Sequence, residues 1–167
     1  MTDTLKLTPH ETLTIVRSDP EVLEVEASYG AGGKPPPPHL HPSQDERFEV
    51  LAGTLSARVD GVERELVAGE VLEIPAGTPH QMWNGSSEGA RVRWETRPGG
   101  RTEQWFRAVD AAIRDAGGDM PGPLAFAPLI DQYRDTFRLA VGPDWAVGPA
   151  MKALGAVGRL RGHKSPP

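Results

Sequence analysis

Two stretches decide the fold of this chain. Residues 33–53 read GKPPPPHLHPSQDERFEVLAG, and residues 69–84 read GEVLEIPAGTPHQMWN. Glycine, histidine, proline and polar residues recur at fixed spacings, namely at Gly33, His39, His41, Glu46 and Gly53 in the first stretch and at Gly69, Pro75, Gly77, His80 and Asn84 in the second. Three of the five histidines of the chain stand at these positions. This concentration indicates that the imidazoles act together.

The residue types at these positions indicate a metal site. In an extended segment side chains alternate between two faces, so His39 and His41 emerge on the same side. Glu46 folds back toward them if residues 43–45 form a turn, and His80 must be brought in by the fold. Three imidazoles and one carboxylate suit a divalent transition ion such as Fe, Mn, Ni, Cu or Zn, whereas Mg and Ca prefer oxygen-only ligand sets.

Both stretches match the two signature motifs of the cupin superfamily at every marked position. The fifteen residues between Gly53 and Gly69 equal the short separation seen in its small bacterial members. Residues 33–84 therefore resemble a single-domain cupin, and the strand pattern extends the resemblance to about residues 10–97. It implies a mainly β fold, the double-stranded β-helix or jelly-roll barrel. It also implies a set of metal ligands inside the barrel: His39, His41, Glu46 and His80.

A plainer interpretation of the first histidines stays open. His39 and His41 follow Lys34 and four prolines, so they could be polar residues on a rigid polyproline loop that binds a proline-recognising module. That interpretation leaves Glu46 and His80 unexplained. The joint spacing of all four residues favours the metal site.

Short segments of alternating polarity, separated by turn residues, predict the strands of the barrel. They are residues 12–16, 22–29, 47–51, 55–60, 62–67, 71–74 and 91–95. Residues an even number of positions from an expected ligand point to the same side of a strand, into the barrel. The inward positions predicted to line a pocket are Phe48, Val50, Leu55 or Ala57, Met82 and Trp94. Such a pocket would favour an apolar or aromatic small molecule over a phosphorylated sugar. The same residues could equally be ordinary barrel core.

After residue 100 the pattern changes to helix. We expect two to three C-terminal α-helices, from Thr102 to about residue 116, from Pro128 to about residue 141, and more weakly from Pro149 to Leu160. We therefore divide the chain into a barrel with N-terminal strands, residues 1–100, and a helical extension, residues 101–167. The apolar stripes of the helices must pack on the barrel or on a second subunit.

Composition narrows the classes of partner. Residues 1–100 carry nine basic and sixteen acidic side chains (−7), and residues 101–167 carry nine and seven (+2), which sum to the formal charge of −5. An acidic barrel is a poor surface for nucleic acid. The absence of cysteine excludes disulfides and Cys-based metal sites. Residues 1–11 lack the apolar run of a leader and no stretch approaches ~18 apolar residues, so we expect a cytoplasmic protein without membrane contact.

The leading hypothesis is a metal-dependent enzyme with oxygenase-type chemistry on a small organic molecule. Glu46 would either stay a ligand or act as the catalytic base. A non-catalytic barrel that binds a metal or a small ligand is the alternative, because cupins include enzymes, storage proteins and sensors. A sugar isomerase or epimerase is disfavoured by the apolar inward positions.

We expect the protein to be a homodimer. Cupins commonly pair through barrel strands, and the helical stripes demand more buried surface than one small barrel face readily supplies. Light scattering at micromolar concentration checks the expectation, and a monomer would contradict it.

Overall fold

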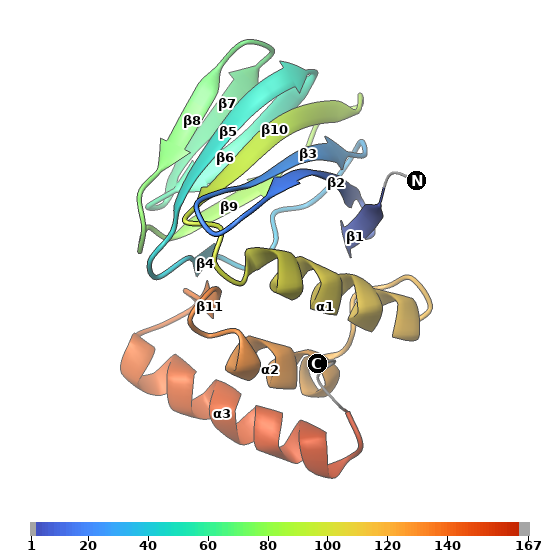
Figure 1. The fold of residues 1–167 in the computed structure, drawn as a ribbon, viewed down its shortest axis with the longest axis vertical. Coiled ribbons are helices and arrows are strands. Elements are labelled where there is room, and N and C mark those ends of the chain that lie inside the picture. Colours follow the sequence, from blue (N-terminus) through green and yellow to red (C-terminus); the bar gives the residue numbers. More distant parts are fainter. Residues whose placement is uncertain (1–2, 164–167) are drawn as a thin grey trace.

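A computed structural model describes residues 3–163, with the backbone alone for 144 and 145. Two antiparallel sheets pack face to face, and three helices lie together at one end of the sandwich (Figure 1). The first sheet contains, in spatial order, β1 (Thr4–Thr8), β2 (Glu11–Ser18), β3 (Leu23–Tyr29), β10 (Ala90–Arg97), β5 (Asp45–Ala52) and β8 (Val71–Ile74). The second contains β11 (Arg138–Leu139), β4 (His39–Leu40), β9 (His80–Trp83), β6 (Thr54–Val59) and β7 (Val62–Val67). This mainly β sandwich is the fold that the two motifs predicted.

Alternating polarity places the core between the sheets. Along β5 the side chains of Glu46, Phe48 and Val50 are buried, and the residues between them are more exposed. The turn after β5 requires glycine, because Gly53 has φ 75° and a Cβ there would collide with the carbonyl oxygen of Gly89. The periodicity and the turn glycine together hold β5 and β6 in register with their neighbours.

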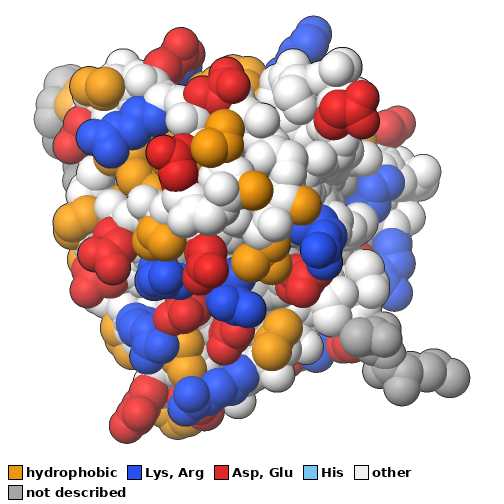
Figure 2. All heavy atoms as spheres, turned by 90° about the horizontal axis from the view of Figure 1, so that it is seen from above, with side chains coloured by type: hydrophobic (Ala, Val, Ile, Leu, Met, Phe, Trp, Pro, Cys, Tyr) orange, Lys and Arg blue, Asp and Glu red, His pale blue; other side chains and the backbone are white. Residues whose placement is uncertain are grey.

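The outer surface of the first sheet carries paired charges. Arg91 lies 2.9 Å from Glu26, and Arg93 lies 3.4 Å from Glu49. Figure 2 shows acidic and basic side chains interspersed over one face of the molecule. On that face the mixed charge offers no continuous basic patch of the kind that nucleic-acid binding uses.

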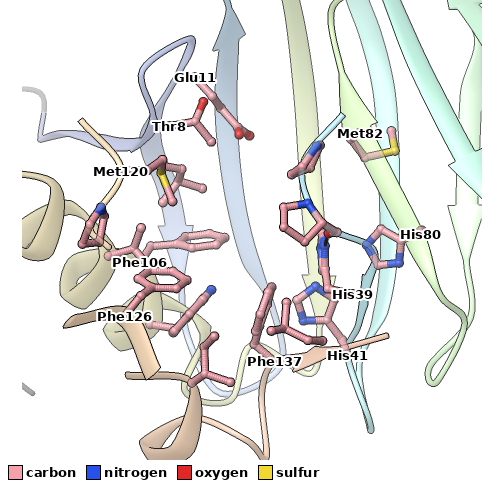
Figure 3. Close-up of a pocket in the computed structure, with 18 of the residues that line it drawn as sticks. Thr8, Glu11, His39, His41, His80, Met82, Phe106, Met120, Phe126 and Phe137 are labelled. Carbon is pink, nitrogen blue, oxygen red and sulfur yellow. Dashed lines mark hydrogen bonds between the residues drawn. The ribbon is translucent and has the colours of Figure 1, made fainter. Parts of the chain in front are cut away.

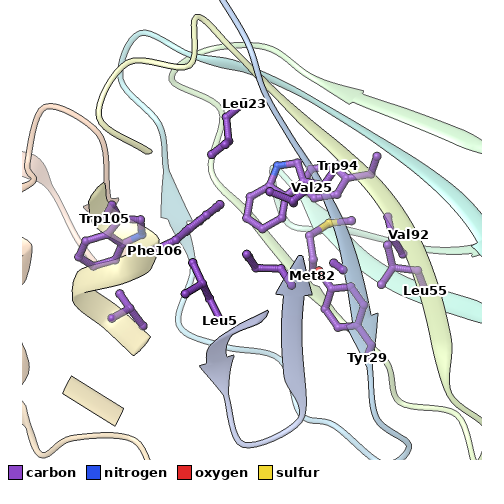
Figure 4. Packing of buried hydrophobic residues seen from close by; sticks show 14 of the residues in the cluster. Leu5, Leu23, Val25, Tyr29, Leu55, Met82, Val92, Trp94, Trp105 and Phe106 are labelled. Atoms are coloured by element: carbon purple, nitrogen blue, oxygen red, sulfur yellow. The ribbon is translucent and has the colours of Figure 1, made fainter. Parts of the chain in front are cut away.

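Strand β1 was not foreseen in the sequence, and it connects the first sheet to the helices. The backbone amide of Lys6 donates a 2.9 Å hydrogen bond to Asp110 of α1 (Thr102–Asp115). The buried face of α1 includes Trp105 and Phe106, and Figure 4 shows Phe106 directed toward the barrel core. Phe106 and Trp94 of β10 have ring centroids 5.0 Å apart. The helix therefore extends the barrel core.

Both predicted limits of the second helix and the predicted start of the third are wrong, whereas the predicted end of the third at Leu160 is confirmed. Helix α2 is Pro123–Gln132 and helix α3 is Asp144–Leu160, so Pro128 and Pro149 lie inside helices. Pro123 stands in the first turn of α2, where the missing backbone N–H breaks no helical hydrogen bond. The helix can therefore begin at Pro123, earlier than predicted. An interior proline costs one helical hydrogen bond, which tertiary packing can offset.

Helices α2 and α3 approach each other closely at Gly158. A Cβ at this position would collide with the carbonyl oxygen of Leu124 and lie 3.0 Å from Cγ of Pro128. The apolar residues of α1 and α2 are mostly buried within one chain. Exposed apolar residues remain on α3 at Leu154, Val157 and Leu160, and the homodimer stays a prediction. Of the helices that the structure describes, none is long and apolar enough to cross a membrane.

Replacing Gly158 by alanine should destabilise the protein by about 1–3 kcal/mol, because the added methyl group collides with backbone. Thermal unfolding followed by circular dichroism should show a melting temperature lower by several degrees, roughly 2–4 °C per kcal/mol. Gly148→Ala is the matched control in the same helix, because its Cβ would meet no described atom within 4 Å. That change should be neutral or slightly stabilising, and an unchanged melting temperature for Gly158→Ala would contradict the close contact.

Candidate metal centre

Three imidazoles converge at the end of the barrel nearest the helices. His39 and His41 stand on and just after β4, and His80 opens β9, directly opposite His39 in the strand register. One nitrogen from each ring lies within 4.8 Å of the others, as a single metal ion would require. Figure 3 shows the three side chains grouped on one wall of a cavity. His41 and His80 are each only 3% exposed.

Backbone carbonyls determine which ring nitrogens point at the centre. Nδ1 of His41 lies 2.7 Å from the Thr136 oxygen, Nδ1 of His80 lies 2.9 Å from the Thr78 oxygen, and Nδ1 of His39 lies 3.3 Å from the Pro37 oxygen. A carbonyl oxygen only accepts, so each Nδ1 carries the hydrogen. A neutral ring then presents a bare Nε2 lone pair. Metal-binding histidines in proteins are typically oriented in this way.

Glu46 reaches the same centre from the opposite sheet. Its Oε2 lies 2.9 Å from His80 Nε2, and its Oε1 lies 3.3 Å from His41 Nε2. Trp94 Nε1 donates a 3.0 Å hydrogen bond to Oε1 and holds the carboxylate in place. Burial alone would raise the pKa of Glu46, but the imidazoles of His41 and His80 outweigh burial and lower it to about 2. Glu46 is therefore ionised at neutral pH.

The same two effects, burial and neighbouring charges, shift the pKa values of His39 and His80. Burial lowers the pKa of His39 to about 3, and the neighbouring His80 and His41 lower it further, so this ring is neutral. Burial also opposes a charge on His80, but the adjacent Glu46 carboxylate outweighs that effect and raises its pKa.

Two buried polar atoms at this centre lack a partner within residues 3–163. They are Nε2 of His41 and Oε2 of Glu46, whose approach to His80 is close but poorly directed for a hydrogen bond. An unsatisfied buried polar atom costs about 1–3 kcal/mol. A divalent cation among the three lone pairs and the carboxylate would satisfy both atoms, so the residues present fit a transition metal.

Comparison with known proteins agrees with the fold. Residues 25–95 match the family model described as "Cupin domain". Over this range, which is less than half of the chain, the sequence is similar to that family. The structure of KdgF from Halomonas sp. superposes with a TM-score of 0.52 at 23% identity, and the match covers 57% of this chain and 87% of that one. At that identity the likeness concerns the fold alone.

Curated relatives match over short segments. The chain is 50% identical over 54 residues to the oxidoreductase iacF of Pestalotiopsis fici, a match that covers 32% of this chain and 26% of that protein. It is 38% identical over 64 residues to quercetin 2,3-dioxygenase of Bacillus subtilis, which covers 38% of this chain and 19% of that protein. The matched segments therefore span about a quarter or less of these relatives. A bacterial source for this chain stays an expectation, because the relatives are fungal as well as bacterial.

The two sheets and the helices line a cavity of about 420 Å³. Phe48, Met82 and Trp94, which parity had turned inward, lie on its wall. Val50 and Leu55 are buried in the core but are not among the lining residues. Each lies farther along its strand from the histidine end, since Val50 comes after Glu46 on β5 and Leu55 comes before Val59, the partner of His80, on β6.

Residues of the helical extension, 101–167, contribute to the histidine site. The sequence had not indicated this contribution. Phe137 was expected inside a helix, but it lies just before β11, which pairs with β4 so that Leu139 stands opposite His39. The Phe137 ring stacks on His39 at 4.8 Å and on Trp105 at 4.7 Å. The carbonyl that orients His41 belongs to Thr136. Only the aromatic richness of residues 105–137 hinted at this role.

Glu46 should make stability depend on pH in protein freed of metal by a chelator. Its pKa is lower in the folded chain than the unfolded value of 4.5, so its contribution is fully present above about pH 4.5 and is lost as the pH falls toward 2. Urea unfolding should show the parent more stable than Glu46→Gln by about 1–3 kcal/mol at pH 6, with the gap narrowing below pH 4.5 and closing toward pH 2. Glu73→Gln, on the exposed side of β8, is the control, and a constant gap would contradict the assigned charge.

Proposed function

We propose that this protein is a metal-dependent enzyme of oxygenase type that acts on an aromatic or otherwise apolar small molecule. His39, His41, His80 and Glu46 would hold a divalent transition metal. The observation that carries the proposal is the orientation of the rings. Three carbonyl-bound Nδ1 atoms leave three Nε2 lone pairs free, and those of His41 and His80 lie within 3.3 Å of the buried Glu46 carboxylate. Without a cation this arrangement leaves buried polar atoms unsatisfied.

The chemistry of the metal would be that of a Lewis acid. A bound divalent ion lowers the pKa of a coordinated hydroxyl and stabilises negative charge on a substrate oxygen. The residues of the chain then position the substrate. The aromatic side chains of Phe48, Trp94 and Phe137 line the cavity next to the histidines, and they would hold a flat ring and exclude water.

Glu46 is the candidate for proton transfer. A carboxylate with a pKa near 2 is a weak base while it pairs with His80 and His41. A substrate hydroxyl that displaces the imidazole from Oε2 would restore basicity and place its own proton on that oxygen. The hydrogen bond from Trp94 to Oε1 keeps the carboxylate aimed at the cavity during this exchange.

The relatives support oxidative chemistry without defining the substrate. One matched protein is named a quercetin 2,3-dioxygenase and another an oxidoreductase. A cavity of about 420 Å³ with largely apolar walls has the size and character of a small-molecule site. A non-catalytic barrel that retains a metal or an apolar ligand would use the same cavity, and it is the alternative that experiment must separate.

Metal content tests the site directly. Protein purified without an affinity tag should contain close to one equivalent of a transition metal by mass spectrometry, and His39→Ala and His80→Ala should each lose most of it. His10→Ala is the control, because His10 lies exposed in the β1–β2 turn. Failure of the parent to bind Fe, Mn, Ni, Cu or Zn on reconstitution would refute the metal centre.

Oxygen consumption separates enzyme from binding protein. The loaded parent should consume dioxygen when given a flavonol or a related phenol, and Glu46→Gln should lose at least about tenfold in rate if this carboxylate takes the proton. A fully loaded protein that binds such phenols without oxygen consumption would favour the non-catalytic barrel.

A further inference from the structure

A second polar group lies in the cavity, away from the histidines. Glu11 of β2 stands directly opposite Tyr29 of β3 in the strand register, so both side chains share one face of the first sheet. Both line the cavity, together with Thr8. Figure 3 shows Glu11 and Thr8 across the cavity from the imidazoles of His39 and His80. The Tyr29 hydroxyl donates a hydrogen bond to the Glu11 carboxylate.

The Glu11 carboxyl has no positively charged partner among the described residues that would account for its burial. Within residues 3–163, no lysine or arginine forms an ion pair with Glu11. Burial is the main influence on the group, and it raises the pKa of Glu11 to about 7 despite the hydrogen bond from Tyr29. An acid held in an apolar cavity without a counter-charge costs stability. Groups of this kind are typical of binding and catalytic sites.

We propose that Glu11 and Tyr29 form a second polar subsite, which accepts a hydrogen bond from a hydroxyl group of the substrate. The substrate would then be an aromatic molecule with polar groups at both ends. One polar end of the substrate would face the histidines. Only this part of the inference rests on the proposed function. The other end would be recognised by Glu11.

The geometry of the pair indicates a hydroxyl as the group recognised. Tyr29 occupies one acceptor position of the carboxylate, and the remaining positions are free to accept from a donor in the cavity. A protonated carboxyl would also accept a hydroxyl hydrogen bond, so a hydroxyl suits both charge states of Glu11. The side chains of Phe106, Met120 and Phe126 lie nearby on the cavity wall and supply apolar surface for the ring of the substrate.

Two probes with the same ring isolate the hydrogen bond. 2-Naphthol carries a hydroxyl donor, and 2-methoxynaphthalene carries a methyl ether that cannot donate. The full chain is kept metal-free with a chelator, and the affinity for each probe is measured by equilibrium dialysis. The parent should prefer 2-naphthol about tenfold, the effect of one hydrogen bond to a charged acceptor.

Glu11→Gln tests the assigned residue with little change in shape. Tyr29 would donate to the amide oxygen, which leaves the amide NH₂ facing the cavity, and a donor cannot accept the naphthol hydrogen. The preference should therefore fall to about one, because the amide NH₂ can donate equally to the oxygen of either probe. Glu21→Gln, at an exposed residue outside the cavity, should behave like the parent. Circular dichroism of each variant verifies folding.

The outcomes separate this inference from the metal centre. An undiminished preference in folded Glu11→Gln would overturn the subsite, because the hydroxyl would then be recognised at the histidine end. Equal affinities of the parent for both probes, or binding of neither probe, would overturn it as well. Because no metal is present in this assay, a failure of metal loading would leave a positive result standing.

Discussion

The buried encounter of the Glu46 carboxylate with the imidazoles of His41 and His80 is the constraint on which the rest of the structure depends. Polar groups at this depth are tolerated only when each has a partner. The partners come from both sheets, because Glu46 lies on β5 and His80 on β9. The indole of Trp94, on β10, completes the contacts of the carboxylate. The sandwich must therefore close correctly before the site exists.

The helical extension is part of the site. Its short strand β11 adds to the second sheet beside β4, which brings the Thr136 carbonyl to His41 and the Phe137 ring to His39. Trp105 stacks behind Phe137 and continues the aromatic packing into α1. The extension thus orients one imidazole, covers another and forms one side of the cavity. Removing it would open the histidine end to water and weaken every electrostatic interaction there.

The cavity combines an apolar interior with polar groups at two separate places. The histidine cluster lies at one end, and Glu11 with Tyr29 lies across from it. An apolar wall contributes affinity with little orientation, whereas each polar group accepts only a matching partner. Two such groups, held on different strands of a rigid sandwich, would select the length and orientation of a ligand as well as its chemistry. This arrangement gives the large cavity a basis for specificity.

The sequence alone determined the mainly β fold and the inward direction of alternate residues on β5, because strand alternation is a local property. Which residues meet at the centre was implied by the resemblance of the two motifs to those of cupins. The sequence did not determine where α2 begins, how Phe137 lies on His39, or that Glu11 enters the cavity. The carbonyl that orients His41 is 95 residues away from it in the chain. Contacts of this kind leave no periodic trace in the sequence. They are decided only when the helices pack on the end of the barrel, since burial and close approach depend on all the neighbours at once.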